Sequence, residues 1–548
     1  MKKYILMKFL LVSLLFSGLT GCKESFLDTP PLGNLTAPNF FNTDAELLAG
    51  TGGLYNRVWF GSNAQSLVAF GDGRAGNMVS PYQTNWMQFY QFTVSNTNGT
   101  LREAWESFFA VVAQSNVLIY NVNTYAKPAV SQIAKNRAIG EARFMRGVAY
   151  SYLVQNWGAV PIITDNLKQG ADTTLSRSTI ETVWEFAIRD MQAAIKLLPI
   201  TSSAGSGRLN AYSAKGMLSR FYLTRAGLGS TNGQRSQMYL DSAKFYANDV
   251  IKNSSYQLMK NYPDLFLTAN NNNPEQLFGL QWVSNGGWGV GNQFQSQFAN
   301  GSELTGTGDG WGGGNGASYD YLVSLNPADS IRRKATFMLP GDYYPELTKA
   351  QGGWRVKVPT DGDGSYDNYA NFKKYIVGTP EDNDGKGQRQ ASANNSYMQR
   401  LADVYLIYAE AILGNNASTS DPEALKYYNA LRIRAGLPPV TSFTIDDLIK
   451  ERRYEFAVEG DAWYALVRLY YYNPQKVIDY IAKQTRGVYK IRIKPGTGTS
   501  AKKREFVFTI LQPGNFKLVS TSFYLPIPDT ETAQAPNLLK PPVPYIFK

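Results

Sequence analysis

Two long parts of the chain carry apolar residues at a helical period. In the C-terminal part, Leu401, Val404, Tyr408 and Ile412 recur every three or four residues, with Tyr405 beside them. This spacing puts them on one face of an amphipathic helix. The N-terminal part repeats the pattern, with a first helix starting at Thr43 and further helices expected over residues 101–120, 138–157, 178–198, 209–226 and 238–253.

Helix start and stop signals divide residues 397–469 into three expected helices. Gly414 and Asn415 end the first, and Asp421 followed by Pro422 is a typical N-terminus for the second. Ala435-Gly436 and the two prolines that follow end the second helix. Thr444 with Asp447 indicates a capping box at the start of the third helix, which we expect to continue towards Leu469.

The helices pair at intervals of roughly 34 to 45 residues, which is typical of tetratricopeptide-like stacking. We therefore predict a mainly α fold, with a helical scaffold over about residues 40–260 and 397–482. An exposed β-hairpin is expected from strands over 488–494 and 505–511, with a Gly- and Thr-rich turn between them.

The helical period disappears between Asn270 and Thr379, and we expect a loop-rich insert over about residues 270–395. Its most irregular part, residues 285–316, is rich in Gly, Asn, Ser and Gln but also carries large aromatic side chains. Long loops inside a compact domain are usually functional or disordered, and large aromatics argue against disorder. Residues 70–95 are also expected to be irregular. We expect the insert, together with residues 74–92, to form a ligand-binding face on the scaffold.

The N-terminus reads as a secretory signal. Lys2, Lys3 and Lys8 flank the short apolar run from Leu10 to Phe16, and Leu-Thr-Gly-Cys follows, ending at Cys22. This motif resembles the lipobox of bacterial lipoproteins, in which the cysteine is lipidated and becomes the mature N-terminus. Cys22 is also the only cysteine of the chain. We expect residues 1–21 to be removed and residues 22–548 to form one domain, tethered to a membrane through Cys22.

Composition removes several classes of function. The 548 residues include no histidine and one cysteine, which excludes Ser-His-Asp and Cys-His catalysis and cysteine-based metal clusters. The net charge of +11 falls to +8 without residues 1–21, and the basic residues are dispersed, so nucleic-acid binding is not expected. Asp361 to Asp367 alternates oxygen ligands as a calcium loop does, but Phe372 stands where a glutamate is needed. We predict no metal and no cofactor.

Three segments resemble the SusD/RagB family of outer-membrane lipoproteins: RLADVYLIYAEA, NALRIRAGLP and KERRYEFAVEGDAWYALVRL. The segment GEARFMRGVAYSYLVQNWGAVP and the opening FLDTPP are similar to the family as well. The resemblance implies a SusD-like scaffold of four helix pairs, exposed on the cell surface. It also implies capture of nutrient glycans, or in some members peptides, and their transfer to a SusC-like TonB-dependent transporter.

Sugars are held by aromatic rings that stack on them and by polar groups that pair with their hydroxyls. In the two irregular regions the candidate ligand-binding residues are Trp86, Tyr90, Trp288 and Trp311 for stacking, with Arg74, Asn85 and Gln293 for hydrogen bonding. The alternative for each aromatic is that it fills the interior of its own loop.

A carboxylate-based glycosidase is the competing enzymatic interpretation. Glu451, Glu455 and Glu459 recur every four residues beside two arginines. They are either an acid/base pair for glycoside cleavage or an ion-pair network between packed helices. The network is favoured, because these residues lie in a segment that the resemblance assigns to the scaffold.

Overall fold

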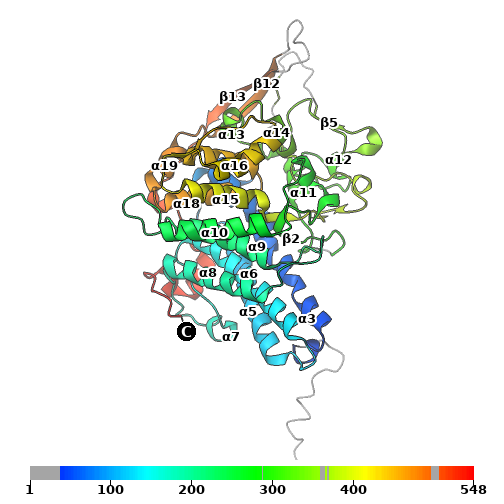
Figure 1. Cartoon of the computed structure of the whole chain (residues 1–548). Helices are drawn as coiled ribbons and strands as arrows, with labels where there is room; N and C mark the ends of the chain where they lie inside the picture. Colours follow the sequence, from blue (N-terminus) through cyan, green and yellow to red (C-terminus); the bar gives the residue numbers. More distant parts are fainter. Residues whose placement is uncertain (1–36, 287, 358–364, 367–369, 495–504, 548) are drawn as a thin grey trace, which may run out of the picture.

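The computed structural model describes residues 37–547 except for 287, 358–364, 367–369 and 495–504. The expected signal segment and Cys22 lie outside the described residues, as does most of the calcium-like stretch. Long helices form layers through the middle of the molecule, the loop-rich insert lies to one side, and a β-hairpin projects from the end opposite α3 (Asp44–Gly50) (Figure 1). The chain is mainly α, as predicted.

The N-terminal scaffold helices form where the pattern predicted them. They are α5 (Gly99–Tyr125), α6 (Gln132–Trp157), α8 (Ile180–Leu197), α9 (Ala211–Arg225) and α10 (Gln237–Asn253). Side chains cap several N-termini, where backbone N–H groups lack helical partners. Thr43 and Glu46 form a capping box at α3, and the side chains of Asn98, Ser131 and Asn210 accept from backbone N–H groups at α5, α6 and α9.

These helices pack in series. Helix α5 lies on α6, α6 on α8, α8 on α9 and α9 on α10. The array then continues into the C-terminal helices, because α10 packs on α15 (Leu401–Leu413) and α15 on α16 (Pro422–Arg434). Small buried residues such as Ala243, Ala247 and Ala411 let α10 and α15 approach closely. This order agrees with tetratricopeptide-like stacking of helix pairs.

The segment expected to form the third C-terminal helix is in fact two helices. Helix α17 (Ile445–Glu455) ends early, and α18 (Ala462–Tyr470) starts after a turn. Val458 and Gly460 both have positive φ, and Asp72 accepts the N–H groups of both. A Cβ on Gly71 would lie 2.1 Å from the Gly460 carbonyl oxygen. The turn is therefore set by contact with residues 71–72, which are remote in sequence.

Residues 70–95, which the sequence predicted to be irregular, contain two helical segments joined by a non-helical stretch over 76–83. Helical structure runs from Phe60 to Ala75 with π-turns at Ser62–Ser66 and Ala69–Gly73, and α4 covers Thr84–Gln91. Helix α4 buries Trp86, Phe89 and Tyr90 on its inner face. Its eight residues are too few to show a clear period in the sequence.

The insert and the other connections of the chain are built from short elements. Strand β2 (Gln276–Leu280) pairs antiparallel with β9 (Ser396–Arg400), which brings the two ends of the insert together. The strand pairs are β1 (Met78–Val79) with β3 (Gly316–Ala317), β4 (Tyr343–Tyr344) with β5 (Trp354–Arg355), β7 (Gly387–Gln388) with β8 (Ala391–Ser392) and β10 (Ser418–Thr419) with β11 (Phe443–Thr444). The short helices are α2 (Ala37–Phe40), α7 (Asn166–Gln169), α11 (Phe294–Phe298), α12 (Ser302–Thr305), α13 (Tyr319–Ser324), α14 (Ser330–Thr336), α19 (Pro474–Ala482) and α20 (Asp529–Gln534).

The predicted hairpin is present as β12 (Gly487–Lys494) and β13 (Glu505–Pro513), with β6 (Ser365–Tyr366) added at the β12 edge. Among the residues that the structure describes, no helix has the length and apolarity needed to cross a membrane.

Candidate functional site

Among the described residues, three large aromatic side chains around the loop-rich insert are more than half exposed. Trp288 is 67% exposed, Trp311 is 54% exposed and Tyr82 is 83% exposed. Aromatic rings of this size are normally mostly buried. Exposed rings that come from neighbouring loops indicate a surface that contacts a ligand. We call Tyr82, Trp288 and Trp311 the aromatic platform.

The Trp311 loop is fixed to α11 through the backbone. The N–H of Trp311 donates to the Ser296 carbonyl at 2.8 Å, and the N–H of Gly312 donates to the Ala299 carbonyl at 2.7 Å. A Cβ on Gly312 would lie 2.4 Å from the carbonyl carbon of Phe298, so only glycine fits there. The glycine-rich sequence therefore allows close backbone packing, while the Trp311 ring stays in solvent.

Tyr82 lies against the same loop, although it is more than two hundred residues away in sequence. Strand β1 pairs with β3, and the Ser80 hydroxyl donates to Asn315 Oδ1 at 2.7 Å. A Cβ on Gly314 would lie 2.2 Å from Tyr82 Cδ2, so the tyrosine ring covers this glycine. Sequence reasoning missed Tyr82, because it follows Pro81 in a turn and belongs to no periodic pattern.

The Trp288 loop leads directly into α11. The N–H of Val283 donates to the Val290 carbonyl at 3.0 Å and closes the loop. The Trp288 ring meets the edge of Phe60, with ring centroids 5.2 Å apart. At the base, Asn292 is fully buried and its side chain donates to the Asn394 carbonyl at 2.9 Å. The two tryptophan loops are thus both anchored at α11, which Figure 1 shows on the insert side of the molecule.

A buried carboxylate stabilises the Trp311 loop from below. Asp309 accepts hydrogen bonds from the hydroxyls of Ser296 and Thr307 and from the N–H of Gln390. Burial raises the pKa of Asp309, but these hydrogen bonds outweigh it and hold the pKa below its usual range. Asp309 is therefore charged at neutral pH and ties three segments of the insert together.

Three of the predicted ligand-binding residues lie in the interior, which corrects the expectation that they share an exposed face. Trp86 and Tyr90 point inward from α4, and Arg74 is 1% exposed. The Arg74 guanidinium lies over the Trp463 ring at 4.0 Å and donates to Asn156 and to the Phe523 carbonyl. Burial raises the pKa of the Tyr90 phenol to about 12.

The remaining predicted residues are divided between surface and interior. Trp288 and Trp311 are exposed and share the α11 anchor. Asn85 is exposed on α4, whereas Gln293 is buried and its amide reaches only Gln390, at 3.4 Å. Of the predicted ligand-binding residues, Trp288 and Trp311 are therefore the two that are exposed and that lie on loops anchored at α11.

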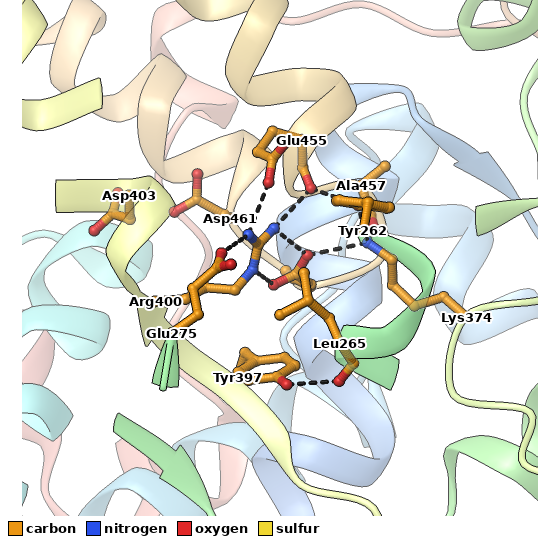
Figure 2. Close-up of polar contacts among 12 residues, drawn as sticks. Tyr262, Leu265, Glu275, Lys374, Tyr397, Arg400, Asp403, Glu455, Ala457 and Asp461 are labelled. Carbon is orange, nitrogen blue, oxygen red and sulfur yellow. Dashed lines mark hydrogen bonds and ion pairs between the residues drawn. The ribbon is translucent and has the colours of Figure 1, made fainter. Parts of the chain in front are cut away.

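The glutamates in the second half of α17 and in the turn after it face arginines in the interior, and Figure 2 shows Glu455 beside Arg400. Arg400 Nη1 lies 2.7 Å from Glu455 and 2.8 Å from Glu275, and its Nε lies 2.8 Å from Glu459. Glu459 also pairs with Lys374 at 3.0 Å, and Glu451 with Arg332 at 2.5 Å. We call these residues the buried charge network.

The surroundings of this network do not suit glycoside cleavage. Burial would raise the pKa of Glu455, but Arg434, Arg400 and Arg332 outweigh it and lower the pKa to about 2. The cavity beside Glu459 measures about 10 Å³, room for at most about one water molecule. Burial raises the pKa of Glu451, yet its carboxylate is bonded to Arg332. The three glutamates thus form the predicted network between helices.

Within the described residues, no group of three or more acidic or cysteine side chains could hold a metal ion.

Comparisons with known proteins agree with this architecture. The profile of the SusD family matches residues 220–543, and a profile described as starch-binding associating with outer membrane matches residues 25–223. A SusD-like protein of Bacteroides ovatus is 39% identical over 538 residues, which cover 96% of both chains.

Solved structures share the fold. One crystal structure, determined with a xylogluco-oligosaccharide, has a TM-score of 0.83 at 37% identity and covers 92% of this chain and 99% of that chain. Surface glycan-binding protein A of Bacteroides thetaiotaomicron, in complex with laminarihexaose, has a TM-score of 0.66 at 19% identity and covers 90% of this chain and 98% of its own. Because one family profile matches more than half of the chain and a close relative spans nearly all of it, the chain belongs to the SusD family.

Proposed function

We propose that this protein is a non-enzymatic glycan-binding lipoprotein of the outer membrane, displayed on the cell surface. It captures oligosaccharides on the aromatic platform and passes them to a SusC-like TonB-dependent transporter. The observation that carries the proposal is the group of exposed rings at Tyr82, Trp288 and Trp311, fixed through the backbone around α11.

The platform suits a neutral sugar chain. The faces of sugar rings carry C–H groups that pack on indole and phenol rings, and an open surface accepts a long chain without enclosing it. Such a site buries only one side of each sugar, so binding is weak enough for release. The relative solved with a xylogluco-oligosaccharide makes a decorated β-glucan the first ligand to test.

Calorimetric titration tests this function. Xyloglucan oligosaccharides, laminarihexaose, maltohexaose and a set of mixed-sequence peptides are added to the protein without its signal segment. We expect measurable binding of at least one glycan, with a dissociation constant in the micromolar to millimolar range, about −8 to −4 kcal/mol. Tight binding of peptides with no response to any glycan would replace the glycan proposal with peptide capture.

The glycines under the platform predict a graded series of affinities. In Gly312→Ala the new Cβ meets the Phe298 backbone, and in Gly314→Ala it meets the Tyr82 ring. Both changes shift a platform ring, and we expect each to weaken glycan binding by about ten-fold, or about 1.4 kcal/mol. Gly313→Ala is the matched control, because its Cβ has only the Asn300 carbonyl as a neighbour, at 3.4 Å. Equal affinities in all three variants would show that the loop does not position the platform.

The anchor proposal predicts a change of cell fraction for Cys22→Ser. Without the thiol no lipid can be attached, so we expect the protein to move from the membrane fraction to the soluble fraction after carbonate washing. Immunoblots of both fractions measure the distribution. Retention of the variant in washed membranes would contradict anchoring through Cys22.

The proposed transporter partner predicts a stable complex. Detergent-solubilised wild-type protein is expected to co-purify with an outer-membrane β-barrel partner in constant ratio.

A further inference from the structure

A large cavity lies between the scaffold and the C-terminal segment, outside the platform. It measures about 870 Å³, a volume that accommodates a disaccharide or a larger small molecule. Its walls combine aromatic and aliphatic side chains with polar ones; they include Trp157, Tyr524, Ile180, Asn96, Thr521 and Ser522. Among the described residues that line the cavity there is no aspartate or glutamate.

Arg74 lies at this cavity and has no carboxylate partner. Nine arginines among the described residues are buried, and seven of them have an acidic side chain within 4 Å. The two exceptions are Arg74 and Arg486, which are neighbours, since Arg486 Nη2 donates to the Arg74 carbonyl at 2.7 Å. The hydrogen bonds of both guanidinium groups go to neutral oxygens.

The electrostatic consequence is a buried positive charge that the protein does not balance. Burial lowers the pKa of Arg74 to about 9, with only the phenols of Tyr464 and Tyr524 acting in the opposite direction. Both arginines remain charged at neutral pH. A buried cation without a partner costs free energy, and an anion bound nearby reduces that cost.

Arg177 supplies a second cation at the cavity. Its Nη2 donates to the Lys540 carbonyl at 2.8 Å, and its Nε is buried without a hydrogen-bond partner among the described residues.

We infer that this cavity binds a carboxylate-bearing sugar, such as a uronic acid unit, with its acid group facing Arg74 and Arg177. The guanidinium donors recognise the carboxylate. The apolar walls pack on the sugar face, and Asn96 and Thr521 offer partners to its hydroxyls. The site is separate from the platform, so the inference does not depend on the proposed function.

Titration with digalacturonate tests the inference, and its dimethyl ester is a neutral ligand of the same shape. At low salt we expect digalacturonate to bind with a dissociation constant below about 1 mM and the ester at least about ten-fold more weakly, since the charged hydrogen bonds are lost. Arg177→Gln is expected to weaken acid binding by about ten-fold or more with an unchanged melting temperature. The control variant Arg102→Gln also removes one positive charge, from an exposed ion pair with Glu106. It is expected to bind digalacturonate with the affinity of the wild type.

Other outcomes overturn the inference. One is equal affinity of the wild type for digalacturonate and for its dimethyl ester. A second is equal affinity of Arg177→Gln and Arg102→Gln for digalacturonate. A third is binding of an Asp-Glu dipeptide without binding of digalacturonate. The double variant Trp288→Ala and Trp311→Ala is expected to bind digalacturonate as tightly as wild type, and loss of binding there would place the acid at the platform instead.

Discussion

Replacing Arg400 with Met is expected to lower the free energy of unfolding by about 3–5 kcal/mol, because three buried carboxylates lose the cation that they share. Arg400 is 1% exposed, and it contacts Glu275, Glu455 and Glu459 at once. In the variant Lys374 still pairs with Glu459, and Arg434 with Glu275 and Glu455. Each carboxylate keeps at least one cation but loses the arginine that joins all three. Urea unfolding followed by circular dichroism measures the loss.

The matched control is Arg102→Met. It removes the arginine of an exposed ion pair in which Arg102 Nε lies 3.8 Å from Glu106 Oε1. An exposed pair of this kind contributes at most about 1 kcal/mol. If Arg400→Met costs no more than Arg102→Met, the buried charge network does not hold the helices together, and its role in the fold is refuted.

The same network has an acid limit. The folded-state pKa of Glu455 is about 2, below the unfolded value of about 4.3. Its contribution to stability is therefore complete above the unfolded pKa and is lost as the pH falls through the folded one. We expect the urea midpoint to fall between pH 4 and pH 2 more steeply in wild type than in Glu455→Gln. Parallel curves for both proteins would contradict this assignment.

Removing both platform tryptophans is the second change with a large expected effect. Trp288→Ala and Trp311→Ala are each expected to weaken glycan binding by about ten-fold or more. The double variant is expected to show no measurable binding, because the aromatic rings that stack on the sugar carry most of the affinity of such a site. Both rings are exposed, so the melting temperature is expected to stay within the range of surface substitutions. Tyr120→Ala removes an exposed ring from α5 and serves as the control.

Unchanged affinity in the double tryptophan variant would move the glycan site away from α11. A loss of affinity of the same size in Tyr120→Ala would show that the effect is not specific to the platform.

The helices were predictable because their signals are local. Thr43, Asp421 and Thr444 cap the helices that their sequence context predicted. The break after Glu455 was not predictable, because it depends on Asp72 and Gly71, nearly four hundred residues away. A contact of that separation leaves no periodic pattern in the segment that it ends.

The platform was predictable in part, for a related reason. The glycine-rich insert around Trp288 and Trp311 stands out by composition, and the structure exposes both rings. Trp86 belongs to a helix too short to reveal its buried face, so its sequence looks like that of a loop aromatic. Tyr82 joins the platform only through the pairing of β1 with β3. Which aromatic rings are exposed depends on these long-range contacts rather than on local sequence.

A crystal structure of the protein with a bound xyloglucan oligosaccharide tests the central claim most directly. We expect sugar rings lying parallel to the indoles of Trp288 and Trp311, with the oligosaccharide continuing towards Tyr82. An oligosaccharide bound at another face, with the three platform rings free of ligand, would contradict it.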